Sequence, residues 1–221
     1  MPFTGTIKDK ATAERDSYEG QFVKGRAEGL HKRYDIKDSL VLECNYEYGE
    51  FHGSYIFNHI NGTEVFNYKN GVKDGEQFEY YDHQRTKEKF HLTYKNGELD
   101  GEWYQYYENG NIEDSYIYKD GKLNGEHVSY TENGILLLRE YFVDGKLNGL
   151  QEKFYNDGTP DTATNYKDAK IHGKYFKYFS DGKIMYEIDY VDHKKHGKDI
   201  MYNGEGKAVD VRIYEHGKRM N

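Results

Sequence analysis

Residues Tyr118-Lys-Asp-Gly-Lys-Leu-Asn-Gly125 contain the pattern on which the whole chain is built: an aromatic residue followed by two glycines four residues apart. Tyr94-Lys-Asn-Gly-Glu-Leu-Asp-Gly101 repeats this pattern 24 residues upstream. A fixed period of this length indicates a repeat array. One shortened interval and one lengthened interval cancel, so the register holds along the chain. The second glycines are Gly5, Gly29, Gly53, Gly75, Gly101, Gly125, Gly149, Gly173 and Gly197.

Aromatic residues recur in step with the glycines. Runs of seven to nine residues rich in Tyr, Phe, Ile and Val lie between the turns, which is the length and composition of strands. Three residues before the first glycine of each pair stand Phe22, Tyr46, Tyr68, Tyr94, Tyr118, Phe142, Tyr166, Tyr190 and Tyr214. Five residues after the second glycine stand Tyr34, Tyr80, Tyr106, Tyr130, Phe154, Tyr178 and Tyr202, with Asn58 as the exception.

Two kinds of connection join these runs. Asx-Gly dipeptides, which favour positive φ at both central residues, predict two-residue type I′ hairpin turns. The connection 120–125 carries two Asx-Gly signals and predicts a wider turn. Altered turns are expected where Ala169 and His193 replace the first glycine and where residues 82–85 replace the Asx-Gly dipeptide. The predicted type I′ turns are Asn109-Gly110, Asn133-Gly134, Asp157-Gly158 and Asp181-Gly182.

The expected fold is all-β, because no segment has the length and 3.6-residue periodicity of a helix that could cover a sheet. Tyr suits a sheet whose faces are partly wet, since its ring is apolar and its hydroxyl is polar. We predict an elongated, twisted, single-layer antiparallel meander of about nine β-hairpins of 24 residues. The chain would form one repeat domain, 1–221, with an N-terminal edge repeat at 1–17, regular repeats at 18–216 and a C-terminal end at 217–221.

Composition excludes several functional classes. The 221 residues carry a net charge of −8, which disfavours nucleic acid and anionic membranes as partners. The longest apolar stretch, Ile135–Leu138, is far too short to span a bilayer, and residues 1–17 lack the apolar core of a secretion signal. The single cysteine, Cys44, cannot form an internal disulfide. A cytoplasmic protein with a basic protein partner is expected.

Histidines are the first candidates for chemistry, because the spacing of His193 and His196 would suit two metal ligands. His52, His172 and His196, however, all precede a second glycine, where other repeats carry Glu, Asp or Asn. We therefore interpret them as polar turn residues and predict no metal site. No acidic pair, catalytic Ser/His/Asp order or phosphate-binding loop stands apart from the repeat, so we predict no cofactor and no enzymatic activity.

The first strand of each repeat separates into two faces. Odd offsets from the second glycine include the recurrent aromatic and are expected to form the scaffold, whereas even offsets vary and carry extra aromatics. These extra aromatics form either a partner-binding surface or the packed inside of a coiled sheet. Leu137 lies in a stretch that is apolar on both faces and is expected to be exposed unless a partner or a dimer contact covers it. The partner-binding candidates are Tyr81, Trp103, Tyr107, Leu137, Tyr155, Tyr175 and Phe179.

The segments Tyr94–Trp103, Tyr106–Gly110 and Tyr118–Gly125 resemble MORN-type repeats, most closely the bacterial variant with the unit Y-K-[ND]-G-K-x-[ND]-G-x-W-x-x-Y-Y-x-[ND]-G. The resemblance covers nearly the whole chain and implies a sheet of hairpins that binds other molecules without intrinsic catalysis. Similar bacterial chains, including the YwqK-like group, have antitoxin or immunity roles, and eukaryotic relatives are scaffolds or contact phospholipid.

This resemblance implies an immunity protein or antitoxin that binds a cognate bacterial toxin and covers its active site. The charge adds the expectation that the toxin is basic, because opposite charges steer association. The alternative is a structural scaffold or a lipid-associated adaptor. A homo-oligomer stays open, and no membrane contact is expected.

Overall fold

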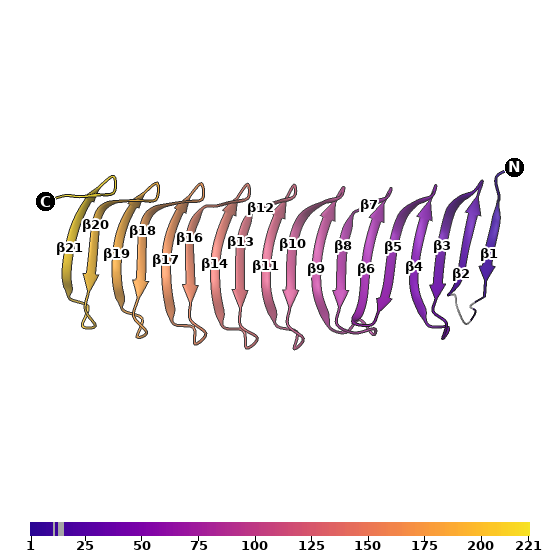
Figure 1. Cartoon of the computed structure of the whole chain (residues 1–221), viewed down its shortest axis with the longest axis horizontal. Coiled ribbons are helices and arrows are strands. Elements are labelled where there is room, and N and C mark those ends of the chain that lie inside the picture. The colour runs from indigo at the N-terminus through magenta and orange to yellow at the C-terminus, as the bar shows by residue number, and fades with distance from the viewer. Residues whose placement is uncertain (11, 13–15) are drawn as a thin grey trace. The chain divides into compact units, whose positions relative to one another are not determined.

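A computed structural model describes residues 1–10, 12 and 16–221, and every regular element among them is a strand. The chain divides into two compact units, Met1–Gly110 and Asn111–Asn221. Within each unit the strands follow one another in chain order (Figure 1) and pair antiparallel with their neighbours. The predicted all-β antiparallel meander of hairpins is therefore confirmed in both units.

The first unit contains ten strands. Its two-residue strand β7 pairs with the end of β6, and the chain then continues as β8, which pairs with the first half of β6. The bounds are β1 Gly5–Asp9, β2 Ser17–Val23, β3 Arg26–Tyr34, β4 Leu40–Glu47, β5 Glu50–His59, β6 Gly62–Lys69, β7 Val72–Lys73, β8 Gly75–Tyr80, β9 Glu88–Lys95 and β10 Glu98–Tyr106.

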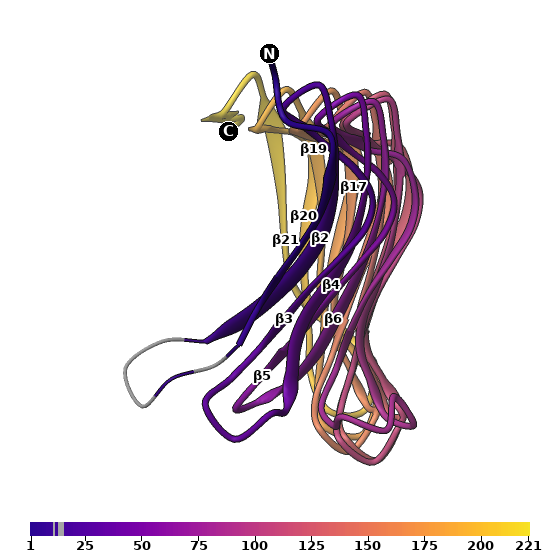
Figure 2. The same ribbon diagram turned by 90° about the vertical axis from the view of Figure 1, so that its right-hand side faces the viewer.

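The second unit contains twelve strands, three of them two residues long. Figure 2 shows that the long strands are bowed along their length. The bounds are β11 Ile112–Lys119, β12 Lys122–Leu123, β13 Gly125–Tyr130, β14 Leu136–Val143, β15 Lys146–Leu147, β16 Gly149–Phe154, β17 Pro160–Lys167, β18 Lys170–Tyr178, β19 Ile184–Val191, β20 Lys194–Tyr202, β21 Ala208–Glu215 and β22 Lys218–Arg219.

The two kinds of turn occur at the opposite ends from those predicted. Asp120 and Gly121 have φ values of 47° and 72°, and Lys119 pairs with Lys122, so this connection is the type I′ turn. At the other end, Gly134 N donates to Thr131 O (2.8 Å) and Thr131 N donates to Ile135 O (2.8 Å), with positive φ at Gly134 alone. That turn is type I followed by a left-handed glycine, as in three-residue hairpin loops.

A β-bulge explains why the prediction of type I′ at Asn133-Gly134 was wrong. Tyr130 pairs with Leu136 but Ser129 pairs with Leu138, so Leu137 is an extra residue in the second strand. The same shift recurs between Lys153 and Phe154 and between Lys177 and Tyr178. An Asx-Gly dipeptide fits either turn, and the extra residue decides between them.

Ala169 and His193 do not alter their turns, contrary to expectation. Both adopt positive φ, 65° and 66°, and each follows an Asp that also has positive φ. The flanking ladder imposes this conformation, because Lys167 pairs with Lys170 directly across the turn. Residues 82–85 do form a different loop, in which the carboxylate of Asp82 accepts hydrogen bonds from both the backbone and the hydroxyl of Thr86.

Most buried residues lie at two repeat positions that pair across neighbouring strands, the second and the fifteenth residue after the second glycine. The recurrent aromatic before the tight turn covers the first of these positions: the rings of His31 and Tyr46 are 4.7 Å apart, and those of Tyr175 and Tyr190 are 6.4 Å apart. The aromatics that precede the tight turns and the even-offset residues therefore share this face. The most buried residues at the first position are Gln77 (0% exposed), His31 (3%), His127 (6%) and Asp199 (8%).

Candidate protein-interaction surface

The seven predicted partner-binding residues occupy three kinds of position in the repeat. Four of them begin a wide connection between paired strands, two lie two residues after a second glycine, and one is a bulge residue. In that order they are Tyr81, Tyr107, Tyr155 and Phe179; Trp103 and Tyr175; and Leu137.

Tyr155 and Phe179 begin successive wide turns in the second unit. We call the turns 131–134, 155–158, 179–182 and 203–206 the wide-turn rim of this unit. Backbone hydrogen bonds from Tyr155 N to Thr159 O and from Phe179 N to Lys183 O, both 2.8 Å, hold the two turns in the same conformation. The rim is therefore a row of pre-formed turns rather than of loose loops.

Tyr155 is the most accessible of the seven candidates, with 42% of its surface exposed. It borders a hollow of about 570 Å³ that combines residues of its own turn with Ser180 from the next turn. An aromatic ring beside an open hollow is the arrangement that interface hot spots use. The lining residues are Phe154, Tyr155, Asn156, Asp157, Thr159 and Ser180.

A charged pair holds the Tyr155 ring in place. The Lys177 ammonium lies 5.7 Å from the ring centroid and forms an ion pair with Asp161. The hydrogen bond from Lys177 lowers the pKa of the Asp161 carboxyl, and the same bond raises the pKa of Lys177, so both groups are ionised at neutral pH. The hollow thus presents an aromatic ring among compensated charges.

In the first unit, Tyr81 and Tyr107 are both half-buried. The Tyr81 hydroxyl donates to Tyr106 O (2.9 Å), so it is already committed within the unit. The backbone carbonyl of Tyr107 accepts a hydrogen bond from Gly110 N (2.9 Å), which closes its turn. These two side chains offer less free surface than Tyr155.

Trp103 and Tyr175 lie two residues after a second glycine, and both are half-buried. The Trp103 ring packs against Phe90 at 5.6 Å, and Tyr175 is paired with Thr164 on one side and Ile188 on the other. Leu137 is half-buried and not exposed as expected, and it is the extra residue of its bulge.

A buried polar network crosses four strands of the second unit, and sequence reasoning missed it. His127 Nδ1 lies 2.9 Å from Glu140 Oε1, and His127 Nε2 lies 3.1 Å from Asp114 Oδ1. Glu140 also accepts a hydrogen bond from the Gln151 amide. The Tyr116 ring stacks on the imidazole at 4.0 Å. The network therefore joins β11, β13, β14 and β16.

The network favours the charged forms of His127 and Glu140. Burial opposes a charge on His127, but hydrogen bonds with Glu140 and Asp114 outweigh burial and raise the pKa of the imidazole. The hydrogen bond from His127 lowers the pKa of Glu140, and Gln151 adds to this effect. Both nitrogens of His127 are engaged, so the network is built to join strands. Its signal in the sequence was a spacing within the repeat: His127 is the second residue after the second glycine, Gly125, and Glu140 is the fifteenth.

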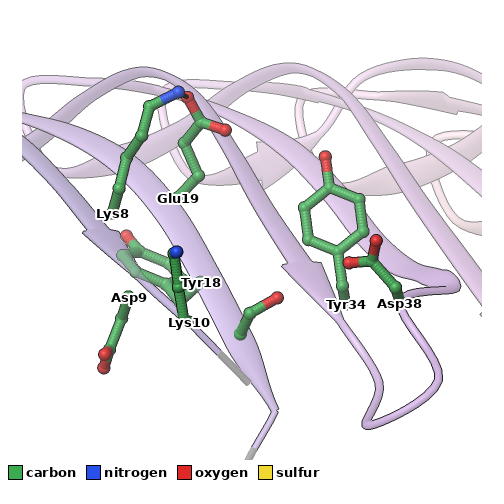
Figure 3. A pocket seen from close by; sticks show the side chains of 8 residues that line it. Lys8, Asp9, Lys10, Tyr18, Glu19, Tyr34 and Asp38 are labelled. Carbon is green, nitrogen blue, oxygen red and sulfur yellow. Dashed lines mark ion pairs between the residues drawn. The ribbon is translucent and has the colours of Figure 1, made fainter.

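A second hollow, of about 610 Å³, lies on the first unit and combines residues of β1, β2 and β3 with Asp38 (Figure 3). Lys8 and Glu19 form an ion pair of 2.5 Å at its edge. The lining mixes both signs of charge and therefore selects no class of ligand by charge. Its residues are Lys8, Asp9, Lys10, Ser17, Tyr18, Glu19, Tyr34 and Asp38.

Over residues 1–10, 12 and 16–221, no group of three His, Cys, Asp or Glu side chains is arranged so that it could hold a metal ion. Two of the histidines interpreted as turn residues lie in strands instead: Nδ1 of His52, in β5, is 2.9 Å from Glu47, and Nδ1 of His172, in β18, is 3.6 Å from Asp192. The described part of the chain also has no helix long and apolar enough to cross a membrane. The absence of a cofactor and of catalysis stays a prediction.

Comparison with known proteins gives one positive finding. Residues 99–122 and 171–192 match the family model of the MORN repeat variant. No curated protein matches the sequence. Both matched segments contain a wide turn, 107–110 or 179–182, and the strands on either side of it, which is the unit that the structure repeats. The chain thus carries MORN-variant repeats at two places, and such repeats indicate a repeat-based binding or scaffold protein.

Proposed function

We propose that this protein is a non-catalytic immunity protein or antitoxin that binds a cognate, basic protein toxin and covers its active site. The observation that carries the binding part is Tyr155, exposed beside a hollow between two pre-formed turns. A rigid aromatic anchor next to a pocket supplies contact area at low entropic cost, which suits tight protein binding. The immunity role rests on the resemblance to bacterial MORN-variant chains.

Charge supports a basic partner. The whole chain carries −8, and wide turns of the second unit place one carboxylate each near their tips, at Glu132, Asp157, Asp181 and Glu205. Of these, Asp181 is paired with Lys183 at 2.9 Å. Association with a cationic toxin domain would be accelerated by this field and slowed by salt, because exposed charges are screened within about 10 Å at 0.1 M salt.

The direct experiment is growth rescue. Toxin domains encoded beside this gene are co-expressed with the chain, and survival is compared with expression of each toxin alone. Rescue by the intact chain supports the proposal. If no adjacent toxin is neutralised and none binds the purified chain, the immunity proposal fails.

A pair of variants tests whether the wide-turn rim makes the contact. Tyr155→Ala is expected to weaken toxin binding at least tenfold, as removal of an aromatic hot spot costs about 2 kcal/mol or more. Tyr48→Ala is the matched control, because Tyr48 is a more exposed tyrosine (74%) at a tight turn of the first unit. Equal affinities for the two variants would move the contact away from Tyr155.

A lipid-binding adaptor is the second candidate, because the tight turns of the second unit place one exposed lysine in every repeat: Lys122, Lys146, Lys170, Lys194 and Lys218. Exposed aspartates at 120, 144, 168 and 192 in the same turns offset this charge. Flotation with vesicles containing phosphatidylserine separates the candidates, since an electrostatic anchor needs net positive charge near the surface. We expect no flotation; binding to these vesicles without a toxin partner would favour the adaptor.

A further inference from the structure

Two neighbouring hairpins of the first unit depart from the regular length, and their connections lie at the same edge of the sheet (Figure 1). Equivalent paired residues are nine positions apart in a regular hairpin such as β13–β14, seven apart in β5–β6 and eleven apart in β8–β9. A short turn is therefore followed by a long loop. These pairs are Ser129 with Leu138, Phe57 with Glu64, and Glu79 with Phe90.

A hollow of about 510 Å³ lies at the short turn. On one side it is lined by the regular connection 35–39 and by half-buried Leu40 and Val41 of β4. On the other side it is lined by His83 and Arg85 of the long loop, with Ile60 of the short turn between the two. We call this cavity the Ile60 hollow. It exists because the turn between a regular connection and a long loop is short.

The backbone around the Ile60 hollow is held in place. Asp35 Oδ1 accepts hydrogen bonds from the N–H groups of residues 37 and 39, at 2.8 and 2.9 Å. Across the base of the long loop, Tyr81 N donates to Lys87 O at 2.9 Å. The short turn lies directly against the end of β8, because a Cβ atom at Gly62 would be 1.9 Å from the carbonyl oxygen of Tyr80. The hollow is therefore pre-formed.

Isoleucines occupy the tips of the regular connection and of the short turn. Ile36 and Ile60 are 59% and 95% exposed, and each is the seventh residue after its second glycine. Apolar side chains of this exposure at two neighbouring tips indicate a surface that a partner covers. The following repeats carry polar residues or glycine at this position: Asp82, Glu108, Glu132, Asn156, Ser180 and Gly204.

The long loop adds a positive charge beside these isoleucines. Arg85 has a φ of 59°, a left-handed conformation that is uncommon for a residue other than glycine. Lys87 of the same loop pairs with Glu108 at 3.1 Å, whereas the Arg85 guanidinium forms no ion pair with a carboxylate of the described residues. His83 is exposed next to it and carries a further N–H donor. The hollow thus combines apolar surface with unused donors for an anion.

We propose that the Ile60 hollow binds a segment of a protein partner that places an apolar side chain beside a carboxylate. The apolar side chain packs on Ile60, and the carboxylate accepts hydrogen bonds from Arg85 and His83. A guanidinium suits this role, because it binds a carboxylate through two parallel hydrogen bonds. The segment is acidic and binds the first unit, so the inference does not rest on the basic toxin proposed for the second unit.

The test is an NMR titration of the full ¹⁵N-labelled chain with a short capped peptide in which a leucine lies between two glutamates. The amide signals of residues 60 and 85 are expected to shift. Two matched peptides, one with lysines in place of the glutamates and one with serine in place of the leucine, are expected to bind about tenfold more weakly. A chain that binds none of the peptides, or all three alike, overturns the proposal.

Variants of Arg85 test the charge. Arg85→Gly removes the guanidinium and favours the left-handed backbone, so it preserves the loop and is expected to weaken the glutamate peptide about tenfold. Arg85→Glu is expected to reverse the preference toward the lysine peptide. Lys69→Glu is the matched control, because Lys69 is an exposed lysine at the other end of β6. Equal effects of Arg85→Glu and Lys69→Glu would mean that only net charge matters and would overturn the site.

Variants of Ile60 test the apolar contact. Ile60→Ser is expected to weaken the glutamate peptide about tenfold, because it removes the side chain on which the leucine packs. Val72→Ser is the matched control, because Val72 is an exposed apolar residue (45%) of β7 in the same unit. Circular dichroism checks that both variants keep the fold. If both bind the glutamate peptide as the unmodified chain does, the proposal is wrong.

Discussion

Gln77 of the first unit and His127 of the second unit occupy the same position of the repeat, and both are buried. The Gln77 amide bonds only to backbone: its Oε1 accepts from Asn67 N, and its Nε2 donates to the carbonyls of Asn67 and Gly75, all at 3.0 Å. His127 bonds to two carboxylate side chains, Asp114 and Glu140. The same buried repeat position therefore holds a neutral, hydrogen-bonded side chain in the first unit and a side chain paired with carboxylates in the second.

The repeat period therefore determines which position is buried, but it does not determine which groups form hydrogen bonds with the polar side chain at that position. Gln77 meets the need for hydrogen bonds in the interior by bonding to the backbone of its own hairpin. His127 takes carboxylates from the strands on either side, so the stability of this site depends on several strands at once. The neutral site is local and insensitive to pH, whereas the ionic site couples neighbouring strands and responds to pH.

The largest effect is expected from Glu140→Ala, which leaves the His127 imidazolium with Asp114 alone. Removal of one partner from a buried ion pair costs about 3–5 kcal/mol. Urea denaturation measures the change in unfolding free energy. Glu126→Ala is the control, because Glu126 pairs with Arg139 at the surface, where such pairs contribute about 0–1 kcal/mol. Similar losses for the two variants would remove the distinction between buried and surface pairs.

The next effect is expected from Gln77→Leu, which removes the amide but keeps an apolar side chain of similar size. The backbone N–H and C=O of Asn67 then lose the amide that pairs with them, at a cost of about 1–3 kcal/mol. The loss should be the same at all pH values at which no other group titrates. A loss that varied with pH in step with histidine ionisation would contradict a purely neutral site.

The pH dependence of unfolding should identify the ionic site. Because the pKa of His127 is raised on folding, its contribution is complete below the usual imidazole value of 6.5 and is lost as pH rises through the folded pKa. Because the pKa of Glu140 is lowered, its contribution is complete above the usual value of 4.5 and is lost as pH falls through the folded pKa. NMR titration of the His127 ring measures the first shift directly, and a ring that titrates below 6.5 would contradict it.

The smallest effect on stability at neutral pH is expected from His127→Gln combined with Glu140→Thr. This double variant copies the neutral pair Gln151 and Thr164 of the following repeat. Exchange of a buried ion pair for neutral groups is often close to neutral, so we expect a change within about 1 kcal/mol. The pH dependence assigned to His127 should disappear. If it persists, another group carries it.

The glycine period and the recurrent tyrosines were sufficient to predict strands, hairpins and their order, because turn chemistry is local. The assignment of turn types failed because an Asx-Gly dipeptide suits both turns, and the bulge at Leu137 depends on pairing with β13. The pairing of His127 with Glu140 was hidden for the same reason, since it needs the register between strands. The candidates Tyr81, Tyr107, Tyr155 and Phe179 shared a repeat position, but only the fold separates the accessible Tyr155 from the others.

Trp103 has a consequence for how the array can be studied. It is the single tryptophan of the chain, and it packs against Phe90 within the first unit. Its fluorescence therefore reports the melting of the strands around Phe90 and Trp103, while the amide circular dichroism signal reports the strands of both units. Two midpoints that differ between these signals would reveal that the repeats melt in blocks, as a one-dimensional chain of nearest-neighbour contacts permits.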